Sequence, residues 1–141
     1  MSTENRIHLI GDFRREEALA AAELYPGHLV EFTSAGKFQK HSTAGGVAER
    51  IVAVEDALQG NTISTAYAAD ALVSANVEQP GNQVQMFLAA GENVANGAKL
   101  ESAGGGALQA VTTGTVIAVA AEAKDLSASG AVATLMAVRF L

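Results

Sequence analysis

Residues Phe87 to Ala110 read FLAAGENVANGAKLESAGGGALQA, and this stretch decides the fold class. Short apolar runs are separated by the pair Asn96-Gly97 and by three consecutive glycines at 104–106. Such residues favour tight turns, because glycine and asparagine adopt positive φ at little cost. The stretch contains no cysteine or histidine. It therefore predicts small β-elements joined by tight turns, and it contains no recognisable catalytic chemistry.

Short strands are predicted along most of the remaining chain, at intervals of about ten residues. Strand-like runs occupy residues 6–10, 28–33, 37–41, 50–55, 71–77, 83–89, 99–101, 107–111, 114–121 and 131–140. We expect hairpins over 28–41 and over 71–89, the second around the turn Gln79-Pro80-Gly81-Asn82. Regular short strands separated by Gly, Asn and Ser predict a mainly β fold with little helix, either a small β-barrel or a sandwich.

The N-terminal segment differs from the rest of the chain. Residues 12–24, DFRREEALAAAEL, contain good helix formers after a possible Asp12 cap, but a helix there would have a narrow apolar face. The alternative is an extended segment that a partner orders. We therefore expect an extended N-terminal arm and linker over residues 1–25 and a single β domain over residues 26–141.

Composition and charge exclude several classes of function. Nine basic and fifteen acidic residues give a net charge of −6, so a nucleic-acid partner is not expected. The chain has no cysteine, which excludes disulfides and thiol chemistry. We expect no secretory signal at the polar N-terminus and no membrane span in the short apolar C-terminal run. Because 29 of the apolar residues are alanine, the core is modest, and association with other chains is expected to complete it.

No constellation of residues predicts an active site or a cofactor site. His8, His28 and His41 are far apart and lack the spacing of a helical metal site. The triple glycine is not followed by the lysine and hydroxyl residue of a phosphate loop, and no GxSxG elbow occurs. A triad assembled only by folding stays open. We expect no enzyme activity, no cofactor and no metal.

The ordered set of segments resembles the capsid decoration proteins of tailed bacteriophages, also called cement or head-stabilising proteins. The segments are RIHLIGD, LYPGHLVEF, KH before STAGG, AVEDALQGNTIS, YAADALV, the run from residue 83 to residue 111, and GTVIAVAAEA. The resemblance implies a small β-rich domain, a β-barrel or β-tulip. It also implies a non-enzymatic virion protein, made in the host cytoplasm, that assembles as a homo-oligomer, with a trimer favoured. Its partner would be the major capsid protein, whose subunits it would bridge on the outer surface of an icosahedral shell.

A specific mode of attachment follows as a hypothesis. The strand-like start of the arm would add to a β-element of the capsid through main-chain pairing. The candidate capsid contacts are Arg6, Ile7, Leu9 and Phe13.

Two other functions remain open at this level. One is a different virion component, such as a head fibre or a head-tail joining protein. The other is a ligand-binding β-barrel, against which the lack of tryptophan and the presence of only two tyrosines, Tyr25 and Tyr67, argue, because sugar sites commonly stack aromatic rings.

Overall fold

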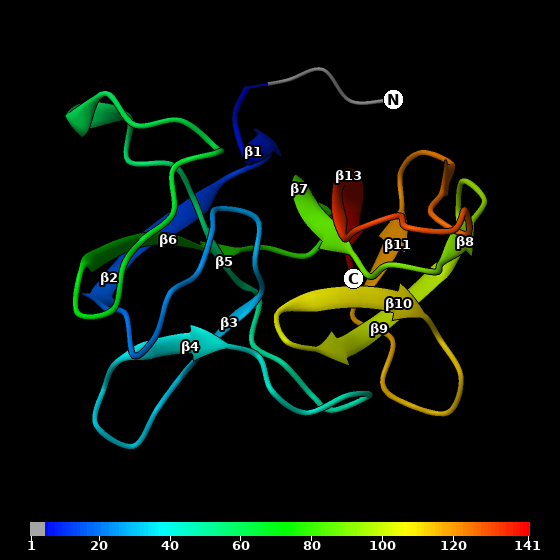
Figure 1. The fold of residues 1–141 in the computed structure, drawn as a ribbon, viewed down its shortest axis with the longest axis horizontal. Coiled ribbons are helices and arrows are strands. Elements are labelled where there is room, and N and C mark those ends of the chain that lie inside the picture. Colours follow the sequence, from blue (N-terminus) through cyan, green and yellow to red (C-terminus); the bar gives the residue numbers. More distant parts are fainter. Residues whose placement is uncertain (1–4) are drawn as a thin grey trace.

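The computed structural model describes residues 5–141, and it is nearly all β (Figure 1). The mainly β prediction is confirmed, and a closed five-stranded barrel lies at its centre. One 3-10 turn, η1 (Ala57–Gln59), interrupts the strands. The strands are β1 (His8–Ile10), β2 (Phe13–Leu19), β3 (Val30–Phe32), β4 (Phe38–Lys40), β5 (Ile51–Ala53), β6 (Leu72–Glu78), β7 (Gln83–Leu88), β8 (Asn93–Val94), β9 (Lys99–Gly104), β10 (Ala107–Ala110), β11 (Ala118–Ala120), β12 (Lys124–Asp125) and β13 (Thr134–Phe140).

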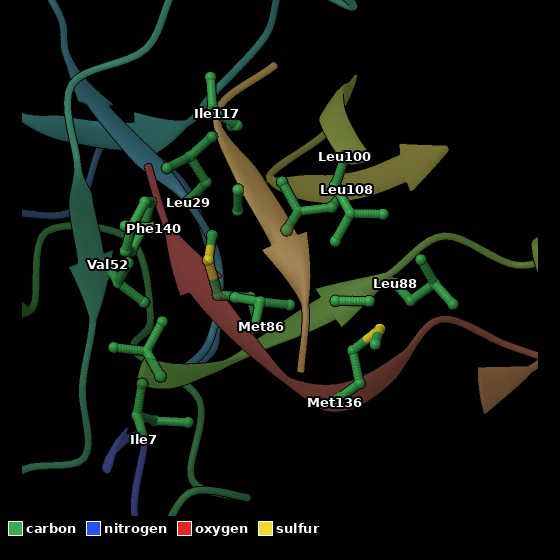
Figure 2. Packing of buried hydrophobic residues seen from close by; sticks show 14 of the residues in the cluster. Ile7, Leu29, Val52, Met86, Leu88, Leu100, Leu108, Ile117, Met136 and Phe140 are labelled. Atoms are coloured by element: carbon green, nitrogen blue, oxygen red, sulfur yellow. The ribbon is translucent and has the colours of Figure 1, made fainter. Parts of the chain in front are cut away.

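The barrel closes through the last strand. Its order is β7-β10-β9-β11-β13, and β13 returns to pair antiparallel with β7 over six positions. Since side chains alternate across a strand, one face of each strand points inward. Met86 and Met136 lie directly opposite each other and are buried, as are Val84 and Val138. Figure 2 shows Met86 and Met136 packed with Leu100, Leu108 and Phe140 from the other strands in this core.

A second, smaller core lies beside the barrel. Strands β2, β6 and β5 form an antiparallel sheet in that order, and β3 and β4 form a hairpin as predicted. Figure 1 shows this part of the chain beside the barrel. The second core consists of the buried residues Ala20, Leu24, Val30, Phe38, Ile51, Ala53, Tyr67, Val73 and Ala75. It has fewer residues than the barrel core, and five of them are alanine or valine.

The hairpin predicted over residues 71–89 is wrong, although both strands and the turn between them form. β6 pairs with β2 and β5, whereas β7 joins the barrel. The physical reason is that the two strands bury different cores: Val73 and Ala75 belong to the small core, and Met86 and Leu88 to the barrel. The turn at residues 79–82 therefore connects two sheets.

The predicted arm is paired with the rest of the chain in its described part. β1 pairs with β7 on the same edge as β10, and Ile7 is fully buried in the barrel core. The helix considered for residues 12–24 does not form, because β2 pairs with β6 along all seven of its residues. The segment is extended, as the alternative stated, but the strand that orders it comes from the same chain. Residues 1–4 of the predicted arm lie outside the described residues.

The buried carboxylate of Glu101 fixes a long loop to the barrel. It accepts hydrogen bonds from Gln109 Nε2 at 2.7 Å, Thr112 N at 3.0 Å and Gly114 N at 2.9 Å. The hydrogen bonds from Gln109, and then from the backbone of Thr112 and Gly114, lower the pKa of this carboxyl. The charged form is thus satisfied although the residue is buried.

Gly114 has no room for a side chain at this junction. A Cβ there would lie 2.4 Å from Gly45 Cα and 2.8 Å from Glu101 Oε1. We predict that Gly114→Ala lowers the free energy of unfolding by about 3 kcal/mol, because the neighbours are backbone and a bonded carboxylate. The control is Gly91→Ala, where nothing lies within 4 Å and only the positive φ of 90° opposes alanine, at a cost of about 1 kcal/mol. Urea denaturation measures both, and equal losses would contradict the packing argument.

Candidate interaction surface

A groove lies between the N-terminal strand and the small sheet. We call it the N-terminal groove; its volume is about 270 Å³, and it is lined by Arg6, His8, Phe13, Arg15, Val54, Glu55, Ala57 and Asn76. Arg15 Nε donates to Asn76 Oδ1 at 3.1 Å, and its guanidinium carbon lies 5.9 Å from the centre of the Phe13 ring. The groove thus presents cationic and aromatic groups that are held in place by neighbours.

A buried polar network anchors the strand that forms one wall of this groove. His8 Nδ1 lies 2.9 Å from Glu78 Oε1, and His8 Nε2 lies 2.6 Å from the carbonyl oxygen of Gly11. Asn82 Nδ2 donates to the same carboxylate at 2.9 Å and to the Asp12 carbonyl at 2.6 Å. Gly11 has φ of 111°, and a Cβ there would lie 1.9 Å from Asn82 Oδ1, so the bend between β1 and β2 requires glycine.

The structure separates the four residues predicted as capsid contacts. Arg6 and Phe13 line the N-terminal groove, and Phe13 is 41% exposed. Leu9 is half-buried on β1. Ile7 has no exposed surface, so it is a core residue and cannot act as an anchor in this conformation.

Six further residues that line the groove were not predicted from the sequence: His8, Arg15, Val54, Glu55, Ala57 and Asn76. Alternation along residues 13–19 placed Phe13 and Arg15 on one face, and it could have identified Arg15. Asn76 comes from β6, and nothing in the sequence indicates which strand lies beside β2.

A second groove, of about 350 Å³, is apolar and lies outside the barrel wall. It is lined by Tyr25, Ile63, Ser64, Phe87, Ala133, Thr134 and Leu135. Leu135 and Phe87 are cross-strand partners on β13 and β7, which places them on the same outward face. The His28 ring lies next to this groove, 4.5 Å from the ring of Phe87.

His28 titrates far below neutrality. Burial, and then the charge of Lys40, lower the pKa of His28 from 6.5 to about 4. Its Nδ1 accepts a hydrogen bond from Tyr25 N at 3.0 Å, which requires the unprotonated nitrogen. The folded protein therefore keeps this ring neutral at pH values where the unfolded chain protonates it.

The low pKa of His28 predicts that the free energy of unfolding decreases on acidification at pH values above those at which carboxylates titrate. As pH falls from 6.5 towards 4, the unfolded state binds a proton that the folded state does not, so stability decreases by about 3 kcal/mol over that interval. Denaturation curves at pH 7.0, 5.5 and 4.5 measure the slope, and His28→Gln should flatten it. An unchanged slope in the variant would refute the assignment.

Ser102, His41 and Glu31 come together in a sequence of contacts that resembles a catalytic triad. Ser102 Oγ lies 2.8 Å from His41 Nδ1, and His41 Nε2 lies 3.7 Å from Glu31 Oε1. However, Ser102 has no exposed surface, and His41 Nε2 also lies 3.1 Å from the Val47 carbonyl oxygen. In this arrangement the hydroxyl cannot reach a substrate, and the three residues connect β9 to β3 and to the segment that follows β4.

Metal-ligating residues do not converge anywhere in residues 5–141: no three His, Cys, Asp or Glu side chains are grouped to hold an ion. The part of the chain that the structure describes also has no helix long and apolar enough to cross a membrane.

Comparison with known proteins gives a likeness in structure and none in sequence. The chain matches no protein-family model and no curated protein. Its fold is similar to that of the head fiber gp8.5 N base of bacteriophage phi29, with a TM-score of 0.63 and 12% identity. The alignment covers 92% of this chain and 95% of that one. At this identity the likeness concerns the fold, over nearly the whole length of both chains.

Proposed function

We propose that this protein is a non-enzymatic structural component of a bacteriophage particle and binds the outer surface of the head. The observation that carries the proposal is the structural likeness to the phi29 head fiber base over 92% of the chain. The order of sequence segments points independently to phage capsid decoration proteins. Both lines support a structural role in a phage particle, and we propose that this small β domain acts by binding at the head exterior.

Within that role we propose that the protein bridges neighbouring major capsid subunits as a decoration protein, and that it does so as a homo-oligomer, with a trimer favoured. Each bridge adds buried interface that must be lost before the shell subunits separate, so many modest contacts stabilise the shell together. The net charge of −6 suits the outer face, because a protein on the inner face would be repelled by packaged DNA.

The second candidate is the base of a head fibre, which the same structural likeness favours. A ligand-binding barrel has less support, because the barrel interior is filled by packed side chains (Figure 2). The two phage functions differ in what the domain supports: a decoration protein ends at the shell surface, whereas a fibre base supports a projecting shaft.

Particle composition tests the role directly. We predict hundreds of copies of this chain in purified particles of its source phage, accessible to antibodies on intact heads. Quantitative mass spectrometry gives the copy number, and immunogold labelling gives the location. Absence from purified particles would overturn the proposal, and a projecting shaft at each labelled site in electron micrographs would favour the fibre base.

Attachment is proposed to use the outer edge of β2 and the residues around it. The sheet order places β2 at an edge, and among residues 5–141 only its C-terminal end, at Ala20, bridges a further strand, at Phe38. The edge before that point is available for main-chain pairing with a partner strand. Arg6 and Phe13 line the N-terminal groove beside it, Leu9 is half-buried on β1, and Ile7 supports β1 from within the core.

Two phenylalanines of equal exposure provide a matched test. Phe13 and Phe32 are each 41% exposed, but Phe32 lies on β3 and packs on Phe38 of the β3–β4 hairpin. We predict that Phe13→Ala weakens binding to heads that lack this protein by about tenfold, because it removes an apolar anchor. Phe32→Ala should leave binding within about twofold. Cosedimentation with heads measures both, and equal effects would remove β2 from the attachment surface.

A further inference from the structure

All five arginines of the chain lie around one turn. The turn at residues 79–82 joins β6 to β7. Each arginine either pairs across strands with, or is hydrogen-bonded to, a residue just before or just after this turn. Arg14 and Arg15 pair with Val77 and Asn76. Arg50 Nε donates to the Glu78 carbonyl at 3.0 Å. Arg139 pairs with Gln83, and the Arg6 carbonyl accepts from Gln85 Nε2 at 2.7 Å. We call this group, Arg6, Arg14, Arg15, Arg50 and Arg139, the arginine pole.

Three of the four lysines lie elsewhere. Lys37 forms an ion pair with Asp70 at 2.7 Å beside the β3–β4 hairpin, Lys40 lies on β4, and Lys124 lies on β12. Lys99 on β9 shares its cross-strand partner, Val119, with Arg139. In a chain of net charge −6, the gathering of every arginine around one turn distinguishes the pole from the remaining surface.

Exposed apolar side chains accompany the arginines. Ile10 is 58% exposed, and it pairs with Gln83, the residue that Arg139 also faces. Phe13 precedes Arg14 and packs against the His8 ring at 4.5 Å. Arginine together with exposed aromatic and aliphatic residues is typical of protein–protein interfaces.

The charges at the pole indicate the chemistry of the partner. Arginine binds carboxylates through two parallel hydrogen bonds, and both Arg14 and Arg139 are exposed. Asp12, Glu16 and Glu55 lie among the arginines, with Glu16 3.6 Å from Arg14, and these carboxylates would repel the continuous phosphates of a nucleic acid. The carboxylates of a protein surface are separated from one another, so they can contact the arginines without lying next to Asp12, Glu16 and Glu55.

We propose that the arginine pole docks an acidic protein surface, whose carboxylates bind the arginines while Ile10 and Phe13 provide apolar anchors. On the proposed function, that surface belongs to the exterior of the phage head, and this identification rests on that proposal. Glu78 and Asn82 support the pole from beneath by fixing the bend between β1 and β2.

Charge reversal with a matched control tests the proposal. Arg139 and Lys37 provide the comparison, because changing either to glutamate alters the net charge by the same amount and Lys37, whose side chain is 38% exposed, lies beside the β3–β4 hairpin at the opposite end of β2 from the turn. We predict that Arg139→Glu weakens binding to heads prepared without this protein by about tenfold, whereas Lys37→Glu changes it less than about twofold. Binding of the wild-type protein should weaken as salt rises. Circular dichroism confirms that each variant is folded.

The outcomes separate this inference from the proposed function. If the wild-type protein binds heads and both variants bind equally well, the arginine pole is overturned and the virion role stands. If the wild-type protein binds no heads, the virion role is overturned, and a second probe decides the pole.

That probe is poly-L-glutamate, titrated into the protein while the arginine Nε–H signals are followed by NMR. Shifts at the pole arginines that salt reverses support an acid-binding surface, and their absence overturns it. Tighter binding of a duplex oligonucleotide than of poly-L-glutamate at this pole would also overturn it.

Discussion

The antiparallel pairing of β13 with β7 is the contact on which the rest of the structure depends. It converts five short strands into a closed barrel, and closure removes the open edges that a small sheet would otherwise present. It also brings Met136 and Val138 against Met86 and Val84, which lie at the centre of the larger core. The small sheet and the N-terminal strand are attached to this barrel, so the position of the N-terminal groove depends on closure.

Local sequence patterns predicted the strands well and their partners poorly. The triple glycine predicted a tight turn, and Gly104, Gly105 and Gly106 all adopt positive φ where β9 ends and the chain turns into β10. Turn chemistry also located the bend at residues 79–82. The turn residues could not show that β6 and β7 belong to different sheets, because the sheet that each strand joins depends on contacts with apolar residues distant in sequence. Pairing between distant strands is a property of the whole fold and leaves little signal in neighbouring residues.

The N-terminal segment shows the same limit for the candidate surface. A helix over residues 12–24 was expected to have only a narrow apolar face, and no helix forms there. The seven pairs that β2 makes with β6 supply the missing stability through main-chain hydrogen bonds, which side-chain composition does not reveal. Of the four predicted contact residues, Arg6 and Phe13 share a groove, whereas Ile7 became part of the core. An apolar residue in a predicted arm is equally compatible with an anchor for a partner and with a core residue of its own domain.

Because β13 is the last strand of the barrel in sequence, the barrel can close only after β13 has been synthesised. Its partner β7 leaves the ribosome about fifty residues earlier, and until Thr134–Phe140 follows, β7 and β11 each present an unsatisfied edge. Contacts of such long sequence separation form slowly. During synthesis, nascent chains would therefore expose unpaired strand edges to one another. A chain that ends before residue 134 would keep these edges open and would be prone to aggregation.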